Sequence, residues 1–522
     1  MERFTAKFAD RVAGVLSGFD RLVFRGTLRQ LAHLEGLRSY LSHQHVLLKD
    51  FGAFVDRVSR GIKKGCLAVA KAQKVPMHYL ESAAISKEDR ARQIAAERQV
   101  TEGPVCLLSC VEAFQGYDIY RNAQTQKLEL VRRMRKCLHY YWYEIHPECG
   151  FLNVRLRSWF PFDLQVCLNG REWLARQMEA AGLSYTRHDN CFSEVEDFAR
   201  AQGLLDAQLR TDWTALLDGL AQKINPARAQ WLGDYCPPYY WTTYQSEWAT
   251  DLVFTEPEEL RHLYPKLVRH AITTLGSEDV LRFLGRRAGV QRYPRAEVSS
   301  DLKTRAEGMR VKHRVNTNSV KAYDKAYTGT RAVLRAETTF NDVSDLKVYR
   351  AKEGGAPEEK TWRRMRKGVA DLQRRAEVSQ AANARYLDAL ASVEDGATLE
   401  ERVRPITQPT TWKGKRVRAL RPLATEDLAL LEIVSRGEFT VNGLRNRDVR
   451  QAQFGADADA SPEEVRRRAG RVTRQLRILR AHGLIQKVSH THRYQVTARG
   501  REIITAVLTA RHASVAQLAE AA

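Results

Sequence analysis

The residues best suited to chemistry lie between positions 309 and 340, where Tyr323, Lys325 and Glu337 interrupt apolar segments. A tyrosine beside lysines gains acidity, because positive charge favours its phenolate, and a phenolate can attack a phosphodiester. A nearby glutamate can hold a divalent metal ion, with Asp324 as a second ligand. This pattern predicts phosphodiester chemistry with Tyr323, Lys325 and Glu337 as catalytic residues. It also predicts Glu337 and Asp324 as metal ligands, with Mg²⁺ or Mn²⁺ as the cofactor.

Strand periodicity would bring these side chains to one surface. The segments GMRVKHRVN, SVKAYDKA and RAVLRAETTF predict a meander of three strands, because successive side chains of a strand point to opposite faces. The apolar face consists of Val311, Val315, Val320, Ala322, Leu334, Ala336 and Phe340. The opposite face consists of Arg310, Lys312, Arg314, Lys321, Tyr323, Lys325, Arg335, Glu337 and Thr339. The contacts to nucleic acid expected on this basic face are Arg310, Lys312, Arg314, Lys321 and Arg335.

A purely structural interpretation of the same face stays open. Glu337 would then neutralise the neighbouring lysines and arginines, and Tyr323 would pack on the sheet. Under this interpretation the basic face binds nucleic acid without an active site.

The run KAYDK followed by LRAET resembles the rolling-circle replication initiators of plasmids and phages, over residues 309–342. Those initiators carry a YDK-like strand beside an R-x-E strand. The resemblance maps the first motif onto Tyr323, Asp324 and Lys325, and the second onto Arg335 and Glu337. It implies DNA nicking by a tyrosine with a bound metal ion. The sequence departs from the initiators in having no His-apolar-His metal motif.

A second informative stretch, residues 461–500, combines a basic helix with a basic hairpin. Apolar residues at helical spacing predict a helix from Ser461 to Gly483, with an inner face made of Val472, Leu476 and Leu479. Two short strands should follow, joined by a basic tip. The side chains expected to touch DNA are Arg467, Arg471 and Arg474 on the helix, and His492 and Arg493 at the tip.

The run LRILRAHGLIQKV…HRYQVTARGREI resembles a MarR-like winged helix-turn-helix, and the resemblance covers about Leu423 to His512. It implies a helix in the major groove of duplex DNA and a hairpin on neighbouring phosphates. Two other interpretations stay open. The arginines form the solvated face of a helical packing module, or the winged helix binds only protein.

A third candidate surface lies in the segment FLNVRLRSWFPFDLQVCLNG. Alternation places Arg155, Arg157 and Trp159 together on one face of a predicted strand. Arginines beside an exposed tryptophan can stack unpaired bases, which points to RNA or single-stranded DNA. The alternative is a half-buried sheet covered by the aliphatic stems of the arginines.

The composition narrows the choice of partners. The 522 residues include 84 Lys and Arg against 62 Asp and Glu, a net charge of +22 that favours a polyanionic partner such as DNA or RNA. No apolar run is long enough to span a bilayer, so no membrane partner is expected. The eight cysteines form no CxxC pair and no zinc-type set with histidines. This pattern favours reduced, mostly buried thiols in a cytoplasmic protein.

The length exceeds what one hydrophobic core supports, which predicts a multidomain α+β protein. We expect a helical N-terminal region, central mixed β-sheet domains and a C-terminal winged helix. The predicted units are 1–74, a helical region; 75–192, an α+β sheet domain; 193–295, a helical region with an aromatic cluster; 296–350, the β-meander with its basic face; 351–422, a long helix and linker; and 423–522, the winged helix-turn-helix.

These patterns favour a DNA-binding protein of replication or mobile-element type that nicks or cleaves DNA. Two alternatives stay open. One is a non-enzymatic winged-helix transcription regulator whose N-terminal part senses a partner or ligand. The other is an RNA-binding protein that uses the Arg155, Arg157 and Trp159 face together with the aromatic cluster at residues 231–248.

Overall fold

One large sheet forms the framework of the protein. The computed structural model describes residues 1–235, 238–285, 298–305, 308–325, 331–351, 360–393, 399–439, 443–456, 460–489 and 491–513. The strands of the sheet are β1 (Val12–Thr27), β2 (Met77–Leu80), β3 (Gly103–Arg121), β4 (Leu128–His146), β5 (Gly150–Arg157), β6 (Leu164–Asn169), β9 (Tyr240–Phe254), β10 (Val298–Arg305), β11 (Gly308–Val315), β12 (Asn318–Lys325) and β13 (Ala332–Phe340).

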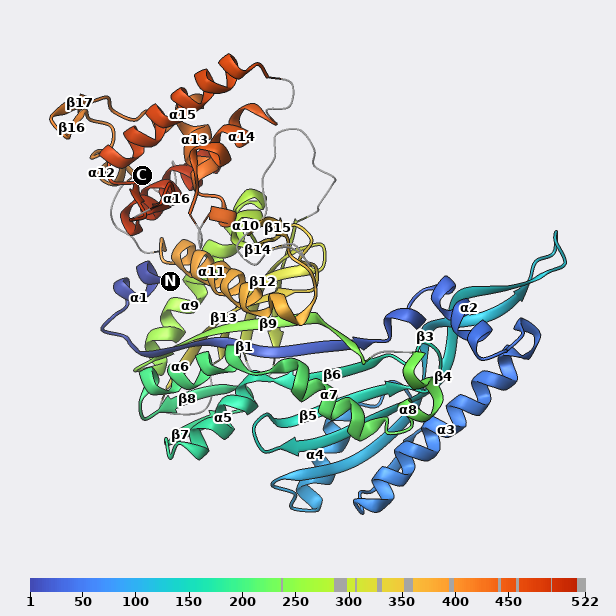
Figure 1. Ribbon diagram of the computed structural model, residues 1–522. Helices are drawn as coiled ribbons and strands as arrows, with labels where there is room; N and C mark the ends of the chain where they lie inside the picture. The colour runs from blue at the N-terminus through green and yellow to red at the C-terminus, as the bar shows by residue number, and fades with distance from the viewer. Residues whose placement is uncertain are drawn as a thin grey trace.

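These 11 strands, counted over the described residues, lie in the order β10-β11-β12-β13-β9-β1-β6-β5-β4-β3-β2 (Figure 1). Strands β2 and β3 pair in parallel, and the other neighbours pair antiparallel. The chain is therefore a multidomain α+β protein with a mixed sheet, as predicted. The meander expected at residues 309–340 is confirmed as β11, β12 and β13.

The two central strands, β1 and β9, lie in ranges that the sequence predicted to be helical, 1–74 and 193–295. Much of each strand is buried, so its side chains do not alternate cleanly between apolar and polar. Strands buried on both faces lose the two-residue period that identifies a strand in a sequence. Because β13 pairs with β9, the meander continues the main sheet instead of forming a domain of its own.

Helices cover both faces of the sheet and form two main cores. In the first core, α2 (Leu34–His43), α3 (Phe51–Ala72) and α7 (Trp213–Ile224) pack with β1, β4, β5 and β6. In the second, α1 (Glu2–Lys7), α9 (Pro257–Thr273), α10 (Ser277–Phe283) and α11 (Leu372–Leu390) pack with β9 and β11–β13. A smaller cluster joins α4 (Lys87–Glu97) to β3 and β4, and α8 (Arg228–Leu232) contacts α3. Among the described helices, none combines the length and the apolar character needed to cross a lipid bilayer.

A buried asparagine fixes α11 to the back of the central strands. The Asn383 amide donates to the Trp248 and Ala336 carbonyl oxygens, each at 3.0 Å, and accepts from the Thr338 hydroxyl at 2.6 Å. A buried amide needs such partners, because a buried polar group without a hydrogen bond costs the full free energy of its desolvation. The network therefore holds β9 and β13 in register from behind, and their other face is left for the polar side chains described below.

The C-terminal unit has a core of its own, made by α13 (Thr425–Val434), α14 (Asn446–Phe454), α15 (Pro462–Ala481), the hairpin β18 (Ile485–Lys487) and β19 (Tyr494–Val496), and α16 (Ala498–His512). The helix predicted between Ser461 and Gly483 is confirmed. The Ser461 hydroxyl accepts from the Glu464 N–H at 3.2 Å, and Gly483 follows the helix at φ 72°. These are the expected start and stop signals.

The region predicted as a long helix and linker is more varied. Strand β15 (Thr361–Arg364) pairs with β14 (Lys347–Arg350), so the long helix predicted in the range 351–422 begins only with α11. The segment before the C-terminal unit contains α12 (Leu399–Val403) and a hairpin of β16 (Thr410–Trp412) and β17 (Lys415–Val417). All seven described cysteines are free, and all but the half-buried Cys167 are buried, in agreement with the expectation of reduced thiols.

Candidate active site on the central strands

The candidate site lies on one face of β11, β12, β13, β9 and β1, where cross-strand neighbours form three rows of side chains. The first row is Arg310, Tyr323, Arg335, Asp251 and Leu16. The second row is Lys312, Lys321, Glu337, Ala249 and Gly18. The third row is Arg314, Ser319, Thr339, Glu247 and Arg21. All five residues of the first row are buried, whereas the third row ends in exposed arginines at both sides, so the site opens along the third row.

A β-bulge adds Asp20 to this face. The register between β1 and β9 shifts between Phe19 and Arg21, so Asp20 has no partner residue on β9. Bulges of this kind turn an extra side chain toward a functional face. The Asp20 carboxylate accepts from Arg335 Nη1 at 3.2 Å and from Asn190 Nδ2 at 2.9 and 3.1 Å.

Two segments fold over the deep end of the rows and contribute polar groups of their own. Helix α5 (Gly170–Ala180) begins so close to β1 that a Cβ on Gly170 would lie 1.8 Å from the Phe19 carbonyl oxygen. This close approach places Arg171 against the sheet. The second segment is the hairpin of β7 (Tyr185–His188) and β8 (Cys191–Val195), whose turn supplies Asn190. The Asn190 carbonyl accepts from Arg335 Nη2 at 2.5 Å.

The deepest ion pairs hold the framework of the site. Arg335 is fully buried and donates to both carboxylate oxygens of Asp251, at 2.6 and 2.8 Å. Arg171 donates to the same carboxylate at 2.9 Å. Burial opposes ionisation of Asp251, but the two guanidinium groups outweigh it and lower the pKa of the carboxyl. Removing one partner of such a buried group leaves an uncompensated charge, so this network is rigid and costly to break.

Three carboxylates from three neighbouring strands converge above these ion pairs. Oxygen atoms of Asp20, Glu247 and Glu337 all lie within 4.8 Å of one another. Opposite ligand atoms on Mg²⁺ are about 4 Å apart, because each bond is about 2 Å long. The spacing therefore suits one divalent cation. The carboxylate oxygens are also the ligand type that Mg²⁺ and Mn²⁺ prefer.

The surroundings of Glu247 compensate its negative charge poorly. Burial, followed by the charge of Glu337, raises its pKa from 4.5 to about 7. Burial also raises the pKa of Asp20, against the opposing effect of Arg335. Burial opposes ionisation of Glu337 as well, but the Lys321 ammonium, which pairs with it directly, lowers its pKa. A cation bound by all three would compensate the charge that Glu247 carries above pH 7.

Tyr323 lies in the first row as predicted, but its environment differs from the expected one. The side chain is 8% exposed, with Lys325 Nζ at 5.5 Å and Arg310 Cζ at 5.9 Å from its ring centre. Burial raises the pKa of the hydroxyl, and the Glu337 carboxylate raises it further. The expectation of a lowered pKa is therefore wrong, because desolvation and Glu337 outweigh the nearby cations.

Asp324, the other predicted metal ligand, lies on the opposite face of β12. Alternation turns it away from Tyr323 and Lys325, and it is not part of the carboxylate triad. Burial raises its pKa, opposed by the charge of Arg261 on α9. The assignment of Asp324 as a metal ligand beside Glu337 is therefore wrong, because adjacent residues of a strand point to opposite faces.

The basic face predicted for nucleic-acid binding is only partly open. Arg310, Lys321 and Lys325 are buried, and Arg335 is fully enclosed by carboxylates and the Asn190 carbonyl. Arg310, Lys321 and Arg335 are thus engaged inside the protein in this structure, and their contact with nucleic acid stays a prediction. Lys312 is half-buried and Arg314 is exposed, so the outer edge of the face keeps the predicted access.

The proposed stacking platform on β5 is not an open surface. Arg155 donates to the Gln165 side chain, and Arg157 donates to Asp163 at 3.1 Å. Trp159 is half-buried, with its ring 4.6 Å from the Arg135 guanidinium carbon and its N–H donating to the Tyr117 carbonyl at 3.0 Å. These three side chains are occupied by internal partners, which agrees with the alternative of a half-buried sheet.

The C-terminal arginines are exposed as predicted. Arg467 and Arg471 have 78% and 50% of their side chains exposed and pair with Glu464 and Glu426, while Arg474 is also exposed. His492 is exposed at the tip of the hairpin. The predicted DNA contact Arg493 is instead half-buried, 5.5 Å from the ring centre of Tyr349 and 5.9 Å from that of Trp362. Its guanidinium packs on the β14–β15 hairpin.

The sequence identified Glu337 but not the residues that surround it. The surrounding residues lie in segments that the sequence predicted to be helical or to which it assigned no functional role. They are Asp20, Glu247, Asp251, Arg171 and Asn190. One signal was available: Asp20 and Asp251 interrupt strongly apolar runs, GFDRLVF and WATDLVF. A carboxylate in such a run is buried, and a buried carboxylate needs a cationic or hydrogen-bonding partner.

Comparison with known proteins adds little to this description. No protein-family model matches the chain, and no curated protein matches it. Among solved structures, the di-domain ARO/CYC StfQ from the steffimycin biosynthetic pathway matches at 12% identity and a TM-score of 0.16, covering 58% of this chain and 91% of that one. A TM-score this low supports no conclusion about fold or function.

Proposed function

We propose that this protein cleaves DNA with a divalent metal ion held by Asp20, Glu247 and Glu337, and that its C-terminal unit is a winged helix-turn-helix that holds duplex DNA. The observation that carries the proposal is the convergence of these three carboxylates beside lysines and arginines on a face that opens to solvent. By sequence resemblance, the class of protein nearest to this proposed function is a replication or mobile-element protein.

The donor set fits the metal. Three carboxylates with oxygen atoms within 4.8 Å of one another supply hard oxygen ligands. Burial and then the charge of Glu337 raise the pKa of Glu247 to about 7, and a divalent cation would favour its ionised form. Such an ion, when bound, polarises a phosphodiester and stabilises the charge that develops during its cleavage. Mg²⁺ and Mn²⁺ both accept this ligand set.

The remaining residues of the face have distinct tasks in this proposal. Arg21, Arg314 and Lys312 line the open edge and bind phosphates of the DNA backbone. Lys321 stays paired with Glu337 and holds that carboxylate in its ionised form. Tyr323 is the proposed nucleophile, supported by its place beside Lys325 and Arg310. A cation on Glu337 would cancel the negative charge that, after burial, raises the pKa of the Tyr323 hydroxyl.

Several features support the winged-helix assignment. The order α13, α14, α15, β18, β19, α16 matches a three-helix unit followed by a hairpin wing, and an isolated bridge joins Leu444 to Tyr494 at the base of that wing. Helix α15 extends away from the sheet in Figure 1, and it presents Arg467, Arg471 and Arg474 to solvent. A helix of this kind enters the major groove while its flanks contact phosphates.

A non-enzymatic DNA-binding regulator is the second candidate. The observation in its favour is the complete burial of Arg171, Arg335 and Asp251, because a fully satisfied ion-pair network can serve stability alone. In that case neighbouring lysine and arginine side chains, Lys321 and Arg335 among them, neutralise the carboxylate triad, and no metal binds. The two candidates make opposite predictions for cleavage. An RNA-binding protein, the remaining alternative, loses support because Arg155, Arg157 and Trp159 are internally occupied.

The test is incubation of the full-length protein with supercoiled plasmid in the presence of Mg²⁺, Mn²⁺ or a chelator. We expect nicked or linear product with either metal and none with the chelator. Glu337→Gln and Asp20→Asn should each slow the reaction about a hundredfold or more, because a metal ligand is lost. Glu258→Gln, which changes an exposed carboxylate of α9, is the matched control. An intact plasmid under all metal conditions would refute the enzymatic proposal and favour the regulator.

A further inference from the structure

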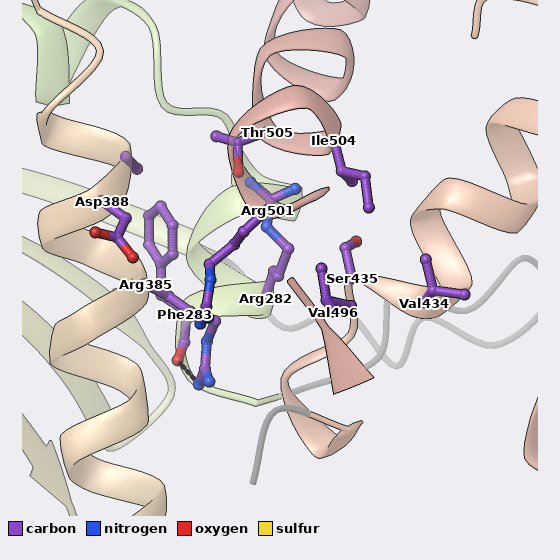
Figure 2. A pocket seen from close by; sticks show the side chains of 11 residues that line it. Arg282, Phe283, Arg385, Asp388, Val434, Ser435, Val496, Arg501, Ile504 and Thr505 are labelled. Atoms are coloured by element: carbon purple, nitrogen blue, oxygen red, sulfur yellow. Dashed lines mark hydrogen bonds between the residues drawn. The ribbon is translucent and has the colours of Figure 1, made fainter. Parts of the chain in front are cut away.

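A second cluster of charged side chains lies between the body of the protein, residues 1–393, and the C-terminal unit. A cavity of about 50 Å³ separates the two parts. The body lines it with Arg282 and Phe283 of α10 and with Arg385, Asp388 and Ala389 of α11. The C-terminal unit lines it with Val434, Ser435, Val496, Arg501, Ile504 and Thr505. Figure 2 shows the side chains of Arg282, Arg385 and Arg501 entering the same space from three different helices.

Positive charge dominates this cavity. Its charged lining consists of three arginines and one carboxylate, Asp388. That carboxylate is already engaged, since it lies 2.6 Å from the Met1 ammonium and accepts from the Arg3 N–H at 3.0 Å. Arg282 pairs with Asp279 on its own helix. The lining of the cavity therefore carries three positively charged side chains and one negatively charged side chain.

The electrostatic effect of the neighbouring arginines is evident at Arg385. It is buried, and its guanidinium donates to the Phe283 carbonyl oxygen. Burial, followed by the charges of Arg282, Arg501 and Arg374, lowers its pKa to about 9. Arg335 in the candidate active site is equally enclosed, yet Asp251 and Asp20 raise its pKa well above the ordinary value. The two buried arginines thus differ in the sign of the charge that faces them.

We propose that this cavity binds a phosphate-sized tetrahedral oxyanion, held by Arg282, Arg385 and Arg501, and that the anion joins the C-terminal unit to the body. This site is separate from the carboxylate triad and does not depend on the proposed function. The ligand is a phosphate or phosphomonoester group.

The size and geometry of the cavity suit such a ligand. A water molecule needs about 10–15 Å³ of this kind of volume, so the cavity itself accommodates a group of a few heavy atoms. Guanidinium groups match the oxygen spacing of phosphate and bind it with two parallel hydrogen bonds. Because Arg501 belongs to the C-terminal unit and the other two arginines to the body, one anion would bridge both parts.

The phosphoryl group has two possible sources. It can be free inorganic phosphate, or it can belong to a larger molecule that extends into an adjoining cavity of about 340 Å³. That second cavity shares Asp388, Arg501 and Thr505 with the first and is otherwise lined by Glu2, Arg3, Ala6, Arg499 and Glu502. Inorganic phosphate and ribose 5-phosphate distinguish the two sources as probes.

The test is isothermal titration of the full-length protein with inorganic phosphate and with ribose 5-phosphate, at an ionic strength held constant with chloride. We expect saturable binding of phosphate at one site per chain. Arg501→Gln should weaken it about tenfold or more, because a charge-assisted hydrogen bond is lost. Arg499→Gln is the matched control, since Arg499 lies on the same helix and lines only the larger cavity.

The possible outcomes separate clearly. Binding that Arg501→Gln and Arg282→Gln both weaken, and Arg499→Gln does not, supports the site. Tighter binding of ribose 5-phosphate than of phosphate would identify a phosphomonoester as the source. Absence of phosphate binding in the wild-type protein would overturn the proposal. Binding that persists unchanged in both the Arg501→Gln and Arg282→Gln variants would do the same, because the anion would then lie elsewhere on this basic protein.

Discussion

Replacing Glu247 with glutamine should stabilise the metal-free protein and at the same time abolish its stabilisation by metal. The pKa of Glu247 rises from 4.5 to about 7 in the folded state because of burial and the Glu337 charge. Above pH 7 the folded protein must carry a carboxylate that it disfavours, at a cost of at most about 3 kcal/mol relative to the unfolded chain. Glutamine has a similar shape and no charge, so this cost disappears in the variant.

The pH dependence gives the sign of the effect. Between pH 4.5 and about 7 the unfolded chain loses the Glu247 proton while the folded chain retains it. The free energy of unfolding of the metal-free wild type should therefore fall as pH rises through this window. Glu247→Gln should remove that part of the decline. Bound metal should reverse it, because the cation favours the ionised carboxylate and binds more tightly as pH rises.

Thermal melting of the full-length chain measures both effects. In chelator above pH 7, Glu247→Gln should melt several degrees higher than the wild type. With millimolar Mg²⁺ the wild type should gain stability by mass action, by about 2.7 kcal/mol at a hundredfold excess over its dissociation constant, and the variant should gain none. Glu258→Gln should behave as wild type in both conditions. A variant that melts lower than the wild type without metal, or responds equally to Mg²⁺, would refute this electrostatic reasoning.

Three further predictions follow from the same structure. Replacing Arg467, Arg471 and Arg474 with alanine should weaken duplex binding and reduce the slope of log affinity against log salt by about three. Replacing Lys63, Lys64 and Lys71 on α3 with alanine removes the same charge and should weaken binding less. An equal loss of affinity in both variants would mean that net charge alone binds DNA. Tyr323→Phe should abolish a covalent adduct with DNA, detected on a denaturing gel, and leave affinity nearly intact; an adduct that persists would assign the nucleophile elsewhere. Arg335→Met should destabilise the protein by about 3–5 kcal/mol in urea unfolding, because Asp251 and Asp20 lose their buried cationic partner. A change under about 1 kcal/mol would show that these ion pairs contribute little to stability.

The sequence predicted the local parts of the site well and its assembly poorly. Alternation along β12 and β13 correctly placed Lys321, Tyr323, Arg335 and Glu337 on one face, because this pattern depends only on strand geometry. It could not predict that α5 and the β7–β8 hairpin cover the deep part of that face. Burial of Arg335 depends on Asp251 and Asp20, which are distant in sequence and meet it only through the strand order.

Asp20 illustrates the limit most clearly. Its side chain reaches the site through a β-bulge, and a bulge breaks the two-residue period from which a face is assigned. Helix α15 shows the opposite case. Its start at Ser461, its end before Gly483 and its buried Val472, Leu476 and Leu479 follow from local signals that the sequence displays directly.

The most direct test of the central claim is a crystal of the full-length protein soaked in Mn²⁺ and measured near the manganese absorption edge. The proposed site predicts one anomalous difference peak between the carboxylates of Asp20, Glu247 and Glu337, within metal-bond distance of an oxygen from each. The peak should vanish in Glu337→Gln crystals prepared in the same way. Wild-type crystals without a peak there, in which Lys321 alone neutralises Glu337, would contradict metal-dependent cleavage at this site.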